Sequence, residues 1–484
     1  MTELRGKKYH IITFGCQMNE HDSEIIAGLL REEGCSEVQE RKDADIVVIN
    51  TCSVRENADK RFFGTLGQLK KQKAANPAFA ACVCGCMMQQ EHIVTRIRRQ
   101  YPWVDVIFGT HNIHEFPQML EQLYRARTAF AGEEDPAGND DLVRMSDHDY
   151  TRAKHEIRSA RQTRVERIFE DKDKIVEGLP AKRLYRHKSF VNIMYGCNNF
   201  CTYCIVPYTR GREKSRAPED ILREVRDLTA DGVREVTLLG QNVNSYRGIS
   251  LEGEGEQVWD FADLIRALDE IDGLERIRFM TSHPKDLSEK LTEAFRSCQK
   301  LCHYIHLPVQ SGSSRVLARM NRRYTREQYL QLVQRLRQAA PDITISTDII
   351  VGFPGETEED FEDTLRLVKE VEYDSAFTFL YSKRKGTPAA DYEDQVPEEV
   401  KHERFNRLVD TLNEISLRKN AAYIGKTVQV LVDGASKKDP GTLSGRTDGF
   451  KLVDFKGDES LVGKTVSVEI TEGKTFSLKG RLKE

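Results

Sequence analysis

A short loop carries three cysteines, Cys197-Asn198-Asn199-Phe200-Cys201-Thr202-Tyr203-Cys204, directly after the strand-like run Phe190 to Tyr195 and the turn residue Gly196. Soft thiolate ligands select iron-sulfur clusters or zinc. Because four-iron clusters commonly take four cysteines, a loop of three predicts one iron without a protein ligand, where a substrate can bind. A zinc knuckle or part of a disulfide scaffold remains an alternative for this motif taken alone.

Length and composition limit the classes of protein to consider. A chain of 484 residues is too long for one core and predicts about three domains. The 39% hydrophobic and 31% charged residues are typical of a soluble protein without a membrane span. The first residues lack the apolar stretch of a signal peptide, so a cytoplasmic location is expected. In that reducing compartment, eleven cysteines indicate metal binding or catalysis rather than disulfides.

Residues 1–130 alternate short β-branched runs with helical stretches, which predicts βαβ units and a parallel sheet. The expected strands are Tyr9 to Phe14, Asp45 to Ile49, Phe79 to Val83 and Val104 to Phe108, and the expected helices are Ser23 to Glu33 and Gln90 to Gln100.

Three cysteines of this first domain share one position relative to the strands. Cys16, Cys52 and Cys86 each lie just past the carboxyl end of an expected strand. Parallel strands bring those ends to one edge, where open α/β sheets bind ligands, so the three are predicted to converge. The alternative for each alone is a buried small hydrophobe. We interpret Cys82 and Cys84, which alternate along the third strand, as core packing.

Residues 131–185 are predicted to be a charged linker or insert. Residues 132–141 are rich in Gly, Asp and Glu, and residues 151–188 hold twelve Lys or Arg against six Asp or Glu. A solvated helix, expected at about Ala153 to Phe169, and an RNA-contacting arm are both compatible with this composition.

The central domain, residues 186–416, repeats a strand followed by a helix, which predicts a partial (β/α)6 barrel with its chemistry at the carboxyl ends of the strands. The expected strands are Phe190 to Tyr195, Val233 to Leu239, Arg276 to Met280, His303 to Leu307, Ile343 to Val351 and Ser375 to Leu380. The helices are expected to begin near Pro218, Asp260, Asp286, Thr325 and Glu358.

Polar clusters follow four of these strands, where a site is expected. They are Gly240 to Asn242, Ser282 to Pro284, Pro308 to Gly312 and Gly352 to Thr357. A basic turn, Thr209 to Arg216, follows the cysteine loop, and its arginines are candidates to clamp phosphate or carboxylate. A solvent-facing turn is the alternative.

Residues 417–484, which follow a long helical connector from Glu398 to Tyr423, read as a small antiparallel barrel. The expected strands are Thr427 to Val432, Gly445 to Asp454, Thr465 to Ile470 and Phe476 to Leu478. Thirteen Lys or Arg stand against nine Asp or Glu in this region. A small basic β-barrel is typical of a nucleic-acid-binding module.

The C-x3-C-x2-C loop after a first strand resembles the radical S-adenosylmethionine (SAM) enzymes. The whole chain resembles their methylthiotransferase family, with a three-cysteine first domain, a radical SAM domain and a TRAM-like terminal barrel. The motifs Thr13 to Asn19, Asn50 to Asn57, Met194 to Cys197 and Arg210 to Glu213 are similar to the MiaB type of that family.

The resemblance implies two 4Fe-4S clusters and SAM as cofactors. It assigns Cys197, Cys201 and Cys204 to the catalytic cluster that binds SAM, and Cys16, Cys52 and Cys86 to an auxiliary cluster that holds the transferred sulfur. On the same family pattern the SAM site is lined by Tyr203, Gly240, Gln241, Asn242, His306 and Gln310.

The implied reaction is methylthiolation of C2 of N6-isopentenyladenosine at position 37 of tRNA. The implied partners are the anticodon loop and an electron donor of unknown identity, with no membrane, and the chain is expected to be a monomer. Two alternatives stay open at this point. One is a methylthiotransferase for threonylcarbamoyladenosine in tRNA or for a ribosomal protein, and the other is a non-catalytic RNA-binding protein with structural zinc.

Overall fold

The computed structural model describes residues 3–53, 56–131, 164–168, 176–251, 255–436, 439 and 441–483. These residues form two compact units. The first comprises Met1–Leu184 together with Tyr208–Gly211, and the second comprises Tyr185–Pro207 together with Arg212–Glu484. None of the described helices combines the length and apolar composition that crossing a membrane requires.

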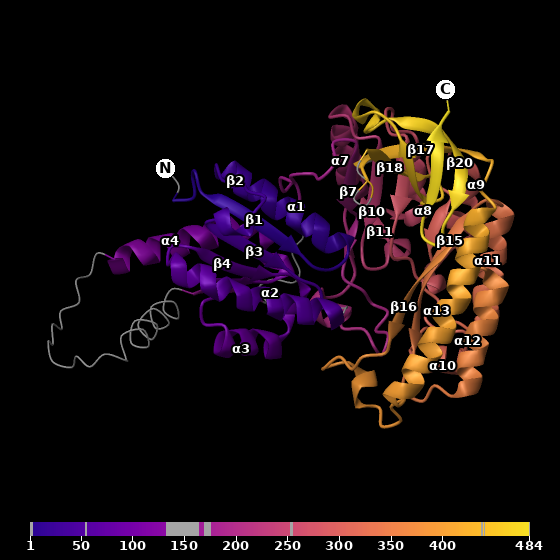
Figure 1. The fold of residues 1–484 in the computed structure, drawn as a ribbon, viewed down its shortest axis with the longest axis horizontal. Coiled ribbons are helices and arrows are strands. Elements are labelled where there is room, and N and C mark those ends of the chain that lie inside the picture. Colours follow the sequence, from indigo (N-terminus) through magenta and orange to yellow (C-terminus); the bar gives the residue numbers. More distant parts are fainter. Residues whose placement is uncertain are drawn as a thin grey trace. The chain divides into compact units, whose positions relative to one another are not determined.

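The first unit is built on a six-stranded sheet in the order β2-β1-β3-β4-β5-β6. Strands β2, β1, β3 and β4 can be followed in Figure 1. All neighbouring strands run parallel, as the alternating pattern predicts. The strands are β1 (Lys8–Thr13), β2 (Ser36–Glu37), β3 (Ile46–Asn50), β4 (Ala80–Cys84), β5 (Val106–Phe108) and β6 (Val165–Arg167).

Helices cover both faces of this sheet. The helices α1 (Gln17–Glu32) and α4 (Phe116–Ala131) pack on one face, and α2 (Glu56–Ala75) and α3 (Glu91–Gln100) pack on the other. The cores on the two faces take alternate residues of the central strands, such as Val48 and Val47 of β3. Cys82 and Cys84 both lie in the core under α1 and α4, which confirms their interpretation as packing residues.

The helix expected at Ala153 to Phe169 is wrong for the residues that the structure describes there. Val165–Arg167 forms strand β6, which pairs with β5 along Val106 to Phe108. Val165 is buried in the core of the first unit, so sheet pairing outweighs the weak helical pattern of the charged stretch. Residues 153–163 lie outside the described part of the chain.

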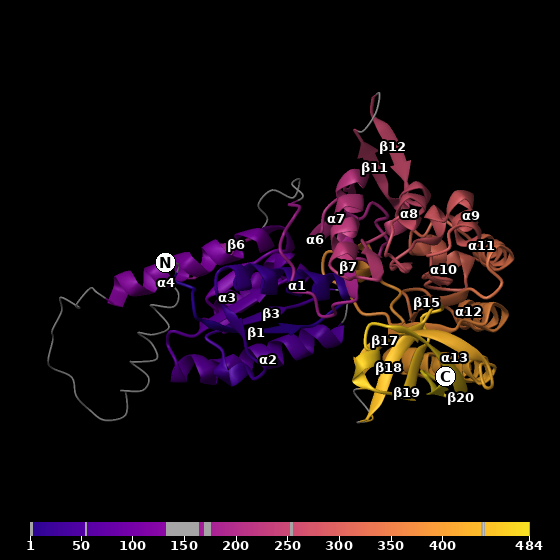
Figure 2. The same cartoon turned by 90° about the horizontal axis from the view of Figure 1, so that it is seen from above.

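The second unit contains the expected partial barrel (Figure 2). Its six parallel strands form two three-stranded sheets, β13-β10-β7 and β14-β15-β16, and a bridge from Ile277 to Leu301 joins the two halves. The strands are β7 (Lys188–Asn192), β10 (Glu235–Leu239), β13 (Arg276–Phe279), β14 (Tyr304–His306), β15 (Thr344–Val351) and β16 (Ser375–Leu380).

The crossover helices begin close to where the sequence predicts them. Asp260, Thr325 and Thr357 each form a capping box, in which the side chain at the helix start accepts a backbone N–H three residues on. The helices are α7 (Pro218–Ala230), α8 (Phe261–Asp269), α9 (Glu289–Ser297), α10 (Ser314–Arg319), α11 (Arg326–Ala339), α12 (Glu358–Val371) and the connector α13 (Glu398–Ala421). Short additions are α6 (Val206–Thr209), β8 (Met194–Tyr195), β9 (Lys214–Ser215) and the hairpin β11 (Arg247–Ser250) and β12 (Gln257–Asp260).

The C-terminal residues close into a barrel in the order β17-β18-β19-β21-β20. Its strands are β17 (Thr427–Ala435), β18 (Thr442–Thr447), β19 (Leu452–Lys456), β20 (Thr465–Gly473) and β21 (Leu478–Leu482). The single strand expected from Gly445 to Asp454 is wrong, because the chain reverses between β18 and β19. Phe450 there adopts a left-handed backbone, and Asp448-Gly449 supplies typical turn residues. The apolar residues on both sides of this turn give the sequence pattern of one continuous strand.

The turn between β18 and β19 packs against the amino ends of strands β14 and β15 of the partial barrel, within the same unit. The ring of Phe450 stacks on Tyr304 of β14 at 4.7 Å between ring centroids. Thr344 of β15 donates from Oγ1 to the Gly449 carbonyl at 2.6 Å. The terminal barrel therefore closes the end of the partial barrel opposite to the cysteine loop.

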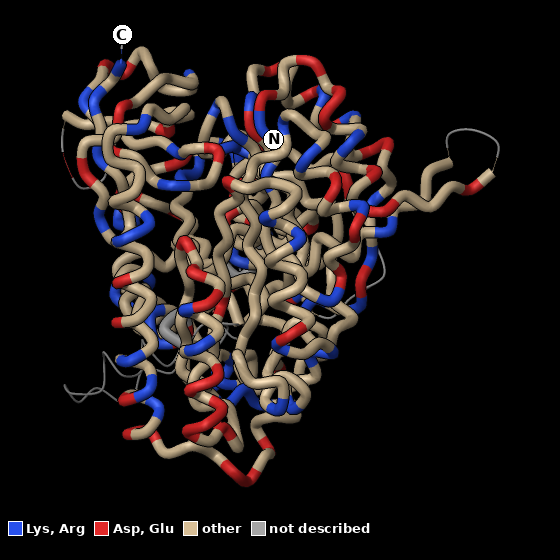
Figure 3. The backbone as a smooth tube through the Cα atoms, turned by 90° about the vertical axis from the view of Figure 1, so that its right-hand side faces the viewer, with Lys and Arg blue, Asp and Glu red and all other residues tan. Residues whose placement is uncertain are grey.

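Basic and acidic positions are interspersed along the backbone near the C terminus, as Figure 3 shows.

Candidate cluster and cofactor sites

Hydrogen bonds with α10 and the turn after it hold the cysteine loop that follows β8. Asn321 donates from Nδ2 to the carbonyls of Asn199 and Phe200, at 3.2 and 3.0 Å. Thr202 donates from Oγ1 to the Arg319 carbonyl at 2.9 Å and from its N–H to the Met320 carbonyl at 3.1 Å. The loop is thus fixed in shape by α10 and the turn after it, so its three thiols are presented in a defined arrangement.

The thiols of Cys197, Cys201 and Cys204 are close enough to influence one another. Burial and then neighbouring charges, including the Cys201 thiolate, raise the pKa of Cys197 to about 11 and that of Cys204 to about 12. The raised pKa values favour neutral thiols in the metal-free protein. Bound iron would favour the thiolates instead, because the thiolate is the form that ligates a metal. The described residues hold no three His, Cys, Asp or Glu side chains placed around a single metal ion. A four-iron cluster is larger than one ion, and three cysteine thiols on one short loop fit its ligand set.

Arg322 is a neighbour of this site that the sequence did not reveal. It is 4% exposed and donates from Nη1 toward Sγ of Cys201 at 3.5 Å. Its Nη2 donates to the Pro308 carbonyl at 2.7 Å, and its Nε to the hydroxyl of Tyr324 at 2.9 Å. Nothing in the run Asn321-Arg322-Arg323 distinguishes the buried arginine from an exposed one, so no sequence signal identifies it.

Two of the residues predicted to bind SAM present buried polar atoms that have no hydrogen-bond partner among the described residues. These atoms are Oε1 of Gln241 and Oδ1 of Asn242, at the carboxyl end of β10. Asn242 is held from its other end, where Nδ2 donates to Asp286 at 2.7 Å. Unpaired buried acceptors are costly, so these atoms fit a site that is completed by a polar ligand.

Backbone conformations that are rare for residues with side chains occur on the same set of loops. Phe200, Thr281 and Gln310 all have φ between 47° and 72°. For Thr281, which is β-branched, this conformation is a genuine outlier. Such strain clusters at ligand sites, where the surrounding structure enforces it. Gln310 is fixed on both sides, since its N–H donates to the Asp348 carbonyl and its carbonyl accepts from Ile350, each at 2.9 Å.

The remaining predicted SAM residues already have partners in the protein. His306 pairs through Nδ1 with the hydroxyl of Ser346 at 2.9 Å, and its Nε2 lies 3.5 Å from Asp348. Tyr203 packs against the small apolar cluster that includes Phe353 and Tyr381. Gly240 leaves no space for a side chain, because an added Cβ would lie 2.5 Å from Met194. Their contact with SAM stays a prediction.

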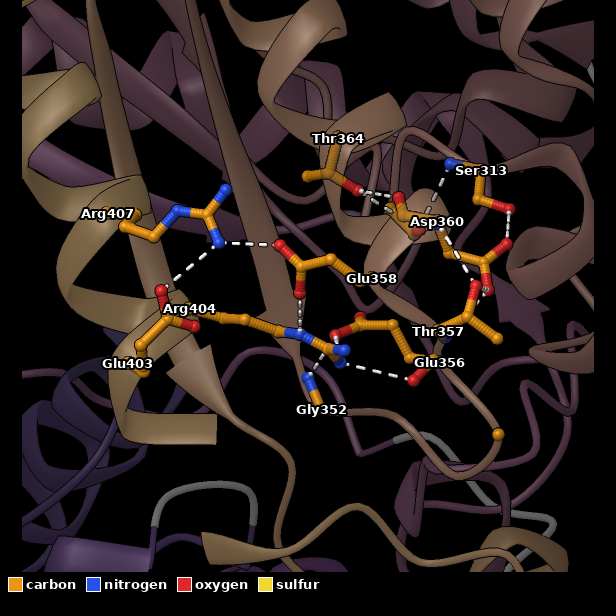
Figure 4. Close-up of polar contacts among 12 residues, drawn as sticks. Ser313, Gly352, Glu356, Thr357, Glu358, Asp360, Thr364, Glu403, Arg404 and Arg407 are labelled. Atoms are coloured by element: carbon orange, nitrogen blue, oxygen red, sulfur yellow. Dashed lines mark hydrogen bonds and ion pairs between the residues drawn. The ribbon is translucent and has the colours of Figure 1, made fainter. Parts of the chain in front are cut away.

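In the polar loop after β15, the buried carboxylate of Glu356 is held by hydrogen bonds within the protein (Figure 4). Glu356 accepts from the N–H of Gly352 and from Nη1 of Arg404 in α13, each at 3.0 Å. Arg404 also pairs with Glu358 at 3.0 Å. The loop that is predicted to lie on the rim therefore also anchors the connector helix α13.

Glu356 makes the stability of the protein depend on pH. Burial raises the pKa of this carboxyl to about 7, because its effect exceeds that of the hydrogen bond from Gly352 and of the Arg404 charge, which both lower the pKa. The pKa of Glu356 is higher in the folded than in the unfolded protein, so protonation of this carboxyl stabilises the fold. This contribution to the free energy of unfolding is complete below about pH 4.5 and is lost as the pH rises through 7. We expect Glu356→Gln, which cannot titrate, to flatten this dependence of the thermal unfolding midpoint between pH 5 and 7.5. An unchanged pH profile would contradict the assignment.

The three cysteines of the first unit meet at one edge of its sheet. Thr13 pairs with Asn50, and Asn50 pairs with Cys84, so the ends of β1, β3 and β4 are in register. Cys16, Cys52 and Cys86 follow these ends directly. The strand register therefore brings the three cysteine loops to one edge of the sheet, as predicted, and three thiols there fit a second cluster.

Two glycines permit this close approach. Gly15 has φ of +144°, and an added Cβ would lie 2.7 Å from Cβ of Cys52. Gly85 has φ of +100°, and an added Cβ would lie 2.2 Å from the Thr51 carbonyl. Any other residue at either position would force the cysteine loops apart.

Asparagines tie the same loops together. Asn19 donates from Nδ2 to Oδ1 of Asn50 at 3.0 Å, and Asn50 donates from Nδ2 to the Asn19 carbonyl at 2.9 Å. The link joins the start of α1, where Cys16 is the N-cap residue, to the loop of Cys52. A hydrogen bond with Cys52, helped by Arg210 and the helix N–H groups, lowers the pKa of Cys16 to about 6 against the effect of burial.

The three arginines of the predicted clamp differ. Arg216 is buried and donates from Nη1 to the Asn192 carbonyl and to Glu224, each at 2.7 Å. Arg210 belongs to the first unit, is 5% exposed and contacts Cys86 and Asp22, so it is not a solvent-facing residue. Arg212 is exposed and lies over the ring of Phe200 at 5.4 Å. Asp22 gave no sequence signal beyond being a charged residue on the buried face of α1.

Comparisons with known proteins agree with this arrangement. Residues 191–368 match the Radical SAM superfamily, residues 8–109 match Uncharacterized protein family UPF0004, and residues 421–483 match the TRAM domain. A tRNA-2-methylthio-N(6)-dimethylallyladenosine synthase from Alkaliphilus oremlandii is 52% identical over 99% of this chain and 93% of its own length. The chain belongs to this synthase family. An enzyme of the same name from Clostridium botulinum is 52% identical over 98% of this chain and 96% of its own.

Solved structures resemble the fold. A radical S-adenosylmethionine methyltransferase, TsrM, from Kitasatospora setae matches 80% of this chain and 75% of its own with a TM-score of 0.50. Its sequence identity of 14% limits the likeness to the fold. Membership of the radical SAM superfamily implies a 4Fe-4S cluster and SAM as cofactors.

Proposed function

We propose that this protein is a tRNA methylthiotransferase that converts N6-isopentenyladenosine beside the anticodon, at position 37, to its 2-methylthio form. The observation that carries the proposal is the convergence of Cys16, Cys52 and Cys86 at one sheet edge, separate in sequence from the C-x3-C-x2-C loop. One cluster suffices for SAM cleavage, and a second set of three thiols supplies the place from which sulfur is transferred. The 52% identity to synthases of this name supports the choice of substrate.

Two 4Fe-4S clusters would be held by the two cysteine sets, and when bound they supply one-electron cleavage of the SAM C–S bond and a site for the sulfur. An unactivated aromatic C–H offers no proton to a general base of ordinary strength, so acid–base side chains alone are insufficient. The task of this chain is to position the reactants. Gln241 and Asn242 would hold polar groups of SAM, since their buried acceptors have no partner among the described residues.

The prenyl group of the substrate explains a preference for modified tRNA. The C2 edge of adenine is hidden in a stacked or paired base, so the target must lie in an exposed loop and be drawn out of it. Burying the five carbons of an isopentenyl group contributes up to about 4 kcal/mol, at about 0.8 kcal/mol per carbon group. Unmodified adenosine lacks this contribution.

We expect the anaerobically reconstituted enzyme to methylthiolate tRNA that carries N6-isopentenyladenosine and to act far less on the same tRNA without the prenyl group. Mass spectrometry of the digested nucleosides measures both products. The matched control is one transcript prepared with and without enzymatic prenylation. Equal turnover of the two, or product found only on threonylcarbamoyladenosine or a ribosomal protein, would reject this substrate and retain the radical SAM chemistry. The reaction is placed in the cytoplasm, where its tRNA and a reducing electron donor are present.

A further inference from the structure

Arg210 is a buried cation that directly contacts a proposed ligand of the auxiliary cluster. Its Nε donates to Sγ of Cys86 at 3.0 Å, and its Nη2 donates to Oδ2 of Asp22 at 2.9 Å. Arg210 and Asp22 are 5% and 4% exposed, and Cys86 is 7% exposed. The three groups therefore form a closed set, in which one guanidinium faces two acidic partners away from solvent.

The net charge of this set depends on the state of Cys86. A buried arginine without compensating partners is costly, and Asp22 alone neutralises it fully. When Cys86 is ionised, as it is when it ligates a metal, Arg210, Asp22 and Cys86 together carry one net negative charge. An arginine guanidinium is not deprotonated in proteins, even when it is buried. Arg210 consequently stays charged beside the sulfur.

Only arginine provides both contacts at once. The planar guanidinium carries donors in a rigid fork, so Nε and Nη2 reach two acceptors on different elements. Asp22 lies in α1 and Cys86 lies after β4. A lysine ammonium retains the charge but lacks this fixed geometry.

We propose that Arg210 is a positioning residue that donates a hydrogen bond to the Cys86 ligand and raises the reduction potential of the cluster held by Cys16, Cys52 and Cys86. This inference rests on the proposed auxiliary cluster. Donation to a ligand sulfur and a nearby positive charge both favour the reduced cluster, because reduction adds negative charge. Arg210 follows Cys204 closely in sequence, so one short segment carries both a proposed ligand of the SAM cluster and the arginine that contacts Cys86.

The test uses the full chain with Cys197, Cys201 and Cys204 changed to alanine, so that any cluster present belongs to the first unit. Into this background we introduce Arg210→Met, Arg210→Lys and, as the matched control from the same turn, Arg212→Met. After anaerobic reconstitution, iron content is determined, and the midpoint potential is measured by a redox titration followed by electron paramagnetic resonance.

We expect Arg210→Met to retain about four irons per chain and to shift the reduction equilibrium at least tenfold toward the oxidised cluster, about 59 mV for one electron. Arg210→Lys should shift it less, and Arg212→Met should not shift it. Loss of the cluster in Arg210→Met with retention in Arg210→Lys also supports the role of the charge. An unchanged potential in Arg210→Met, or equal cluster loss in both Arg210 variants, overturns it. Absence of a cluster in the background chain itself rejects the auxiliary cluster, and with it this inference.

Discussion

Replacement of Cys16, Cys52 and Cys86 by alanine is expected to abolish methylthio product while SAM cleavage to 5'-deoxyadenosine continues. The cysteines that would bind the SAM cluster lie in a separate loop of the second compact unit, so the loss of the first set leaves that site intact. Iron content should fall from about eight to about four per chain. Replacement of Cys197, Cys201 and Cys204 should instead abolish both products. Liquid chromatography with mass spectrometry quantifies 5'-deoxyadenosine and the modified nucleoside.

Cys82 and Cys84 provide the matched control for this experiment, because they neighbour Cys86 in sequence. Both are buried in the core beneath α1 and α4, where burial raises the pKa of each thiol well above its usual value. The double variant Cys82→Ala, Cys84→Ala should keep about eight irons and both products. If the triple variant of the first unit cannot cleave SAM even with its remaining cluster fully reconstituted, the proposed division between the two cysteine sets is incorrect.

The sequence predicted the topology of the sheets better than the ends of individual strands, for a physical reason. Cys16, Cys52 and Cys86 were found because parallel topology places residues after successive strands at one edge, and the topology follows from strand and helix alternation. Their role in binding a cluster stays a prediction, which the fit of three convergent thiols supports.

Tertiary contacts decided what the sequence could not. Val165–Arg167 lies in a charged stretch with a weak helical pattern, yet it completes a sheet because β5 offers an unpaired edge and Val165 finds a core. Arg210 lies in a run of basic residues that is typical of an exposed turn. Its burial depends on Asp22 and Cys86, which are distant in sequence, so no local pattern reports it.

The terminal barrel contributes stability that its basic composition did not suggest. Arg278 of β13 is 2% exposed and donates from Nη1 and Nη2 to the carbonyls of Asp448 and Thr447, at 2.6 and 2.7 Å. Its Nε donates to Glu235 of β10 at 2.9 Å. These bonds join the terminal barrel to the partial barrel through a buried charge, so a deletion of residues 425–484 would also remove partners that Arg278 requires.

Arg278→Met is therefore expected to destabilise the second unit by about 3–5 kcal/mol, the usual cost of removing one partner from a buried ion pair. Glu235 would keep only the more distant Arg276 and Lys188, at 3.8 and 3.9 Å. The matched control is Arg481→Met on the same terminal barrel. Arg481 pairs with Glu469 at 3.0 Å and its side chain is 71% exposed, so its loss should cost less than about 1 kcal/mol.

Urea unfolding of the full chain, followed by fluorescence and circular dichroism, compares the two variants. Equal midpoints for Arg278→Met and Arg481→Met would show that the turn between β18 and β19 does not stabilise the partial barrel. The result also decides how RNA binding by the terminal barrel has to be tested. If Arg278→Met is destabilising as expected, truncation would confound a lost RNA contact with a damaged fold, and exposed lysines must be replaced singly instead. A change in the salt dependence of tRNA binding, without a change in unfolding, would then identify the phosphate contacts.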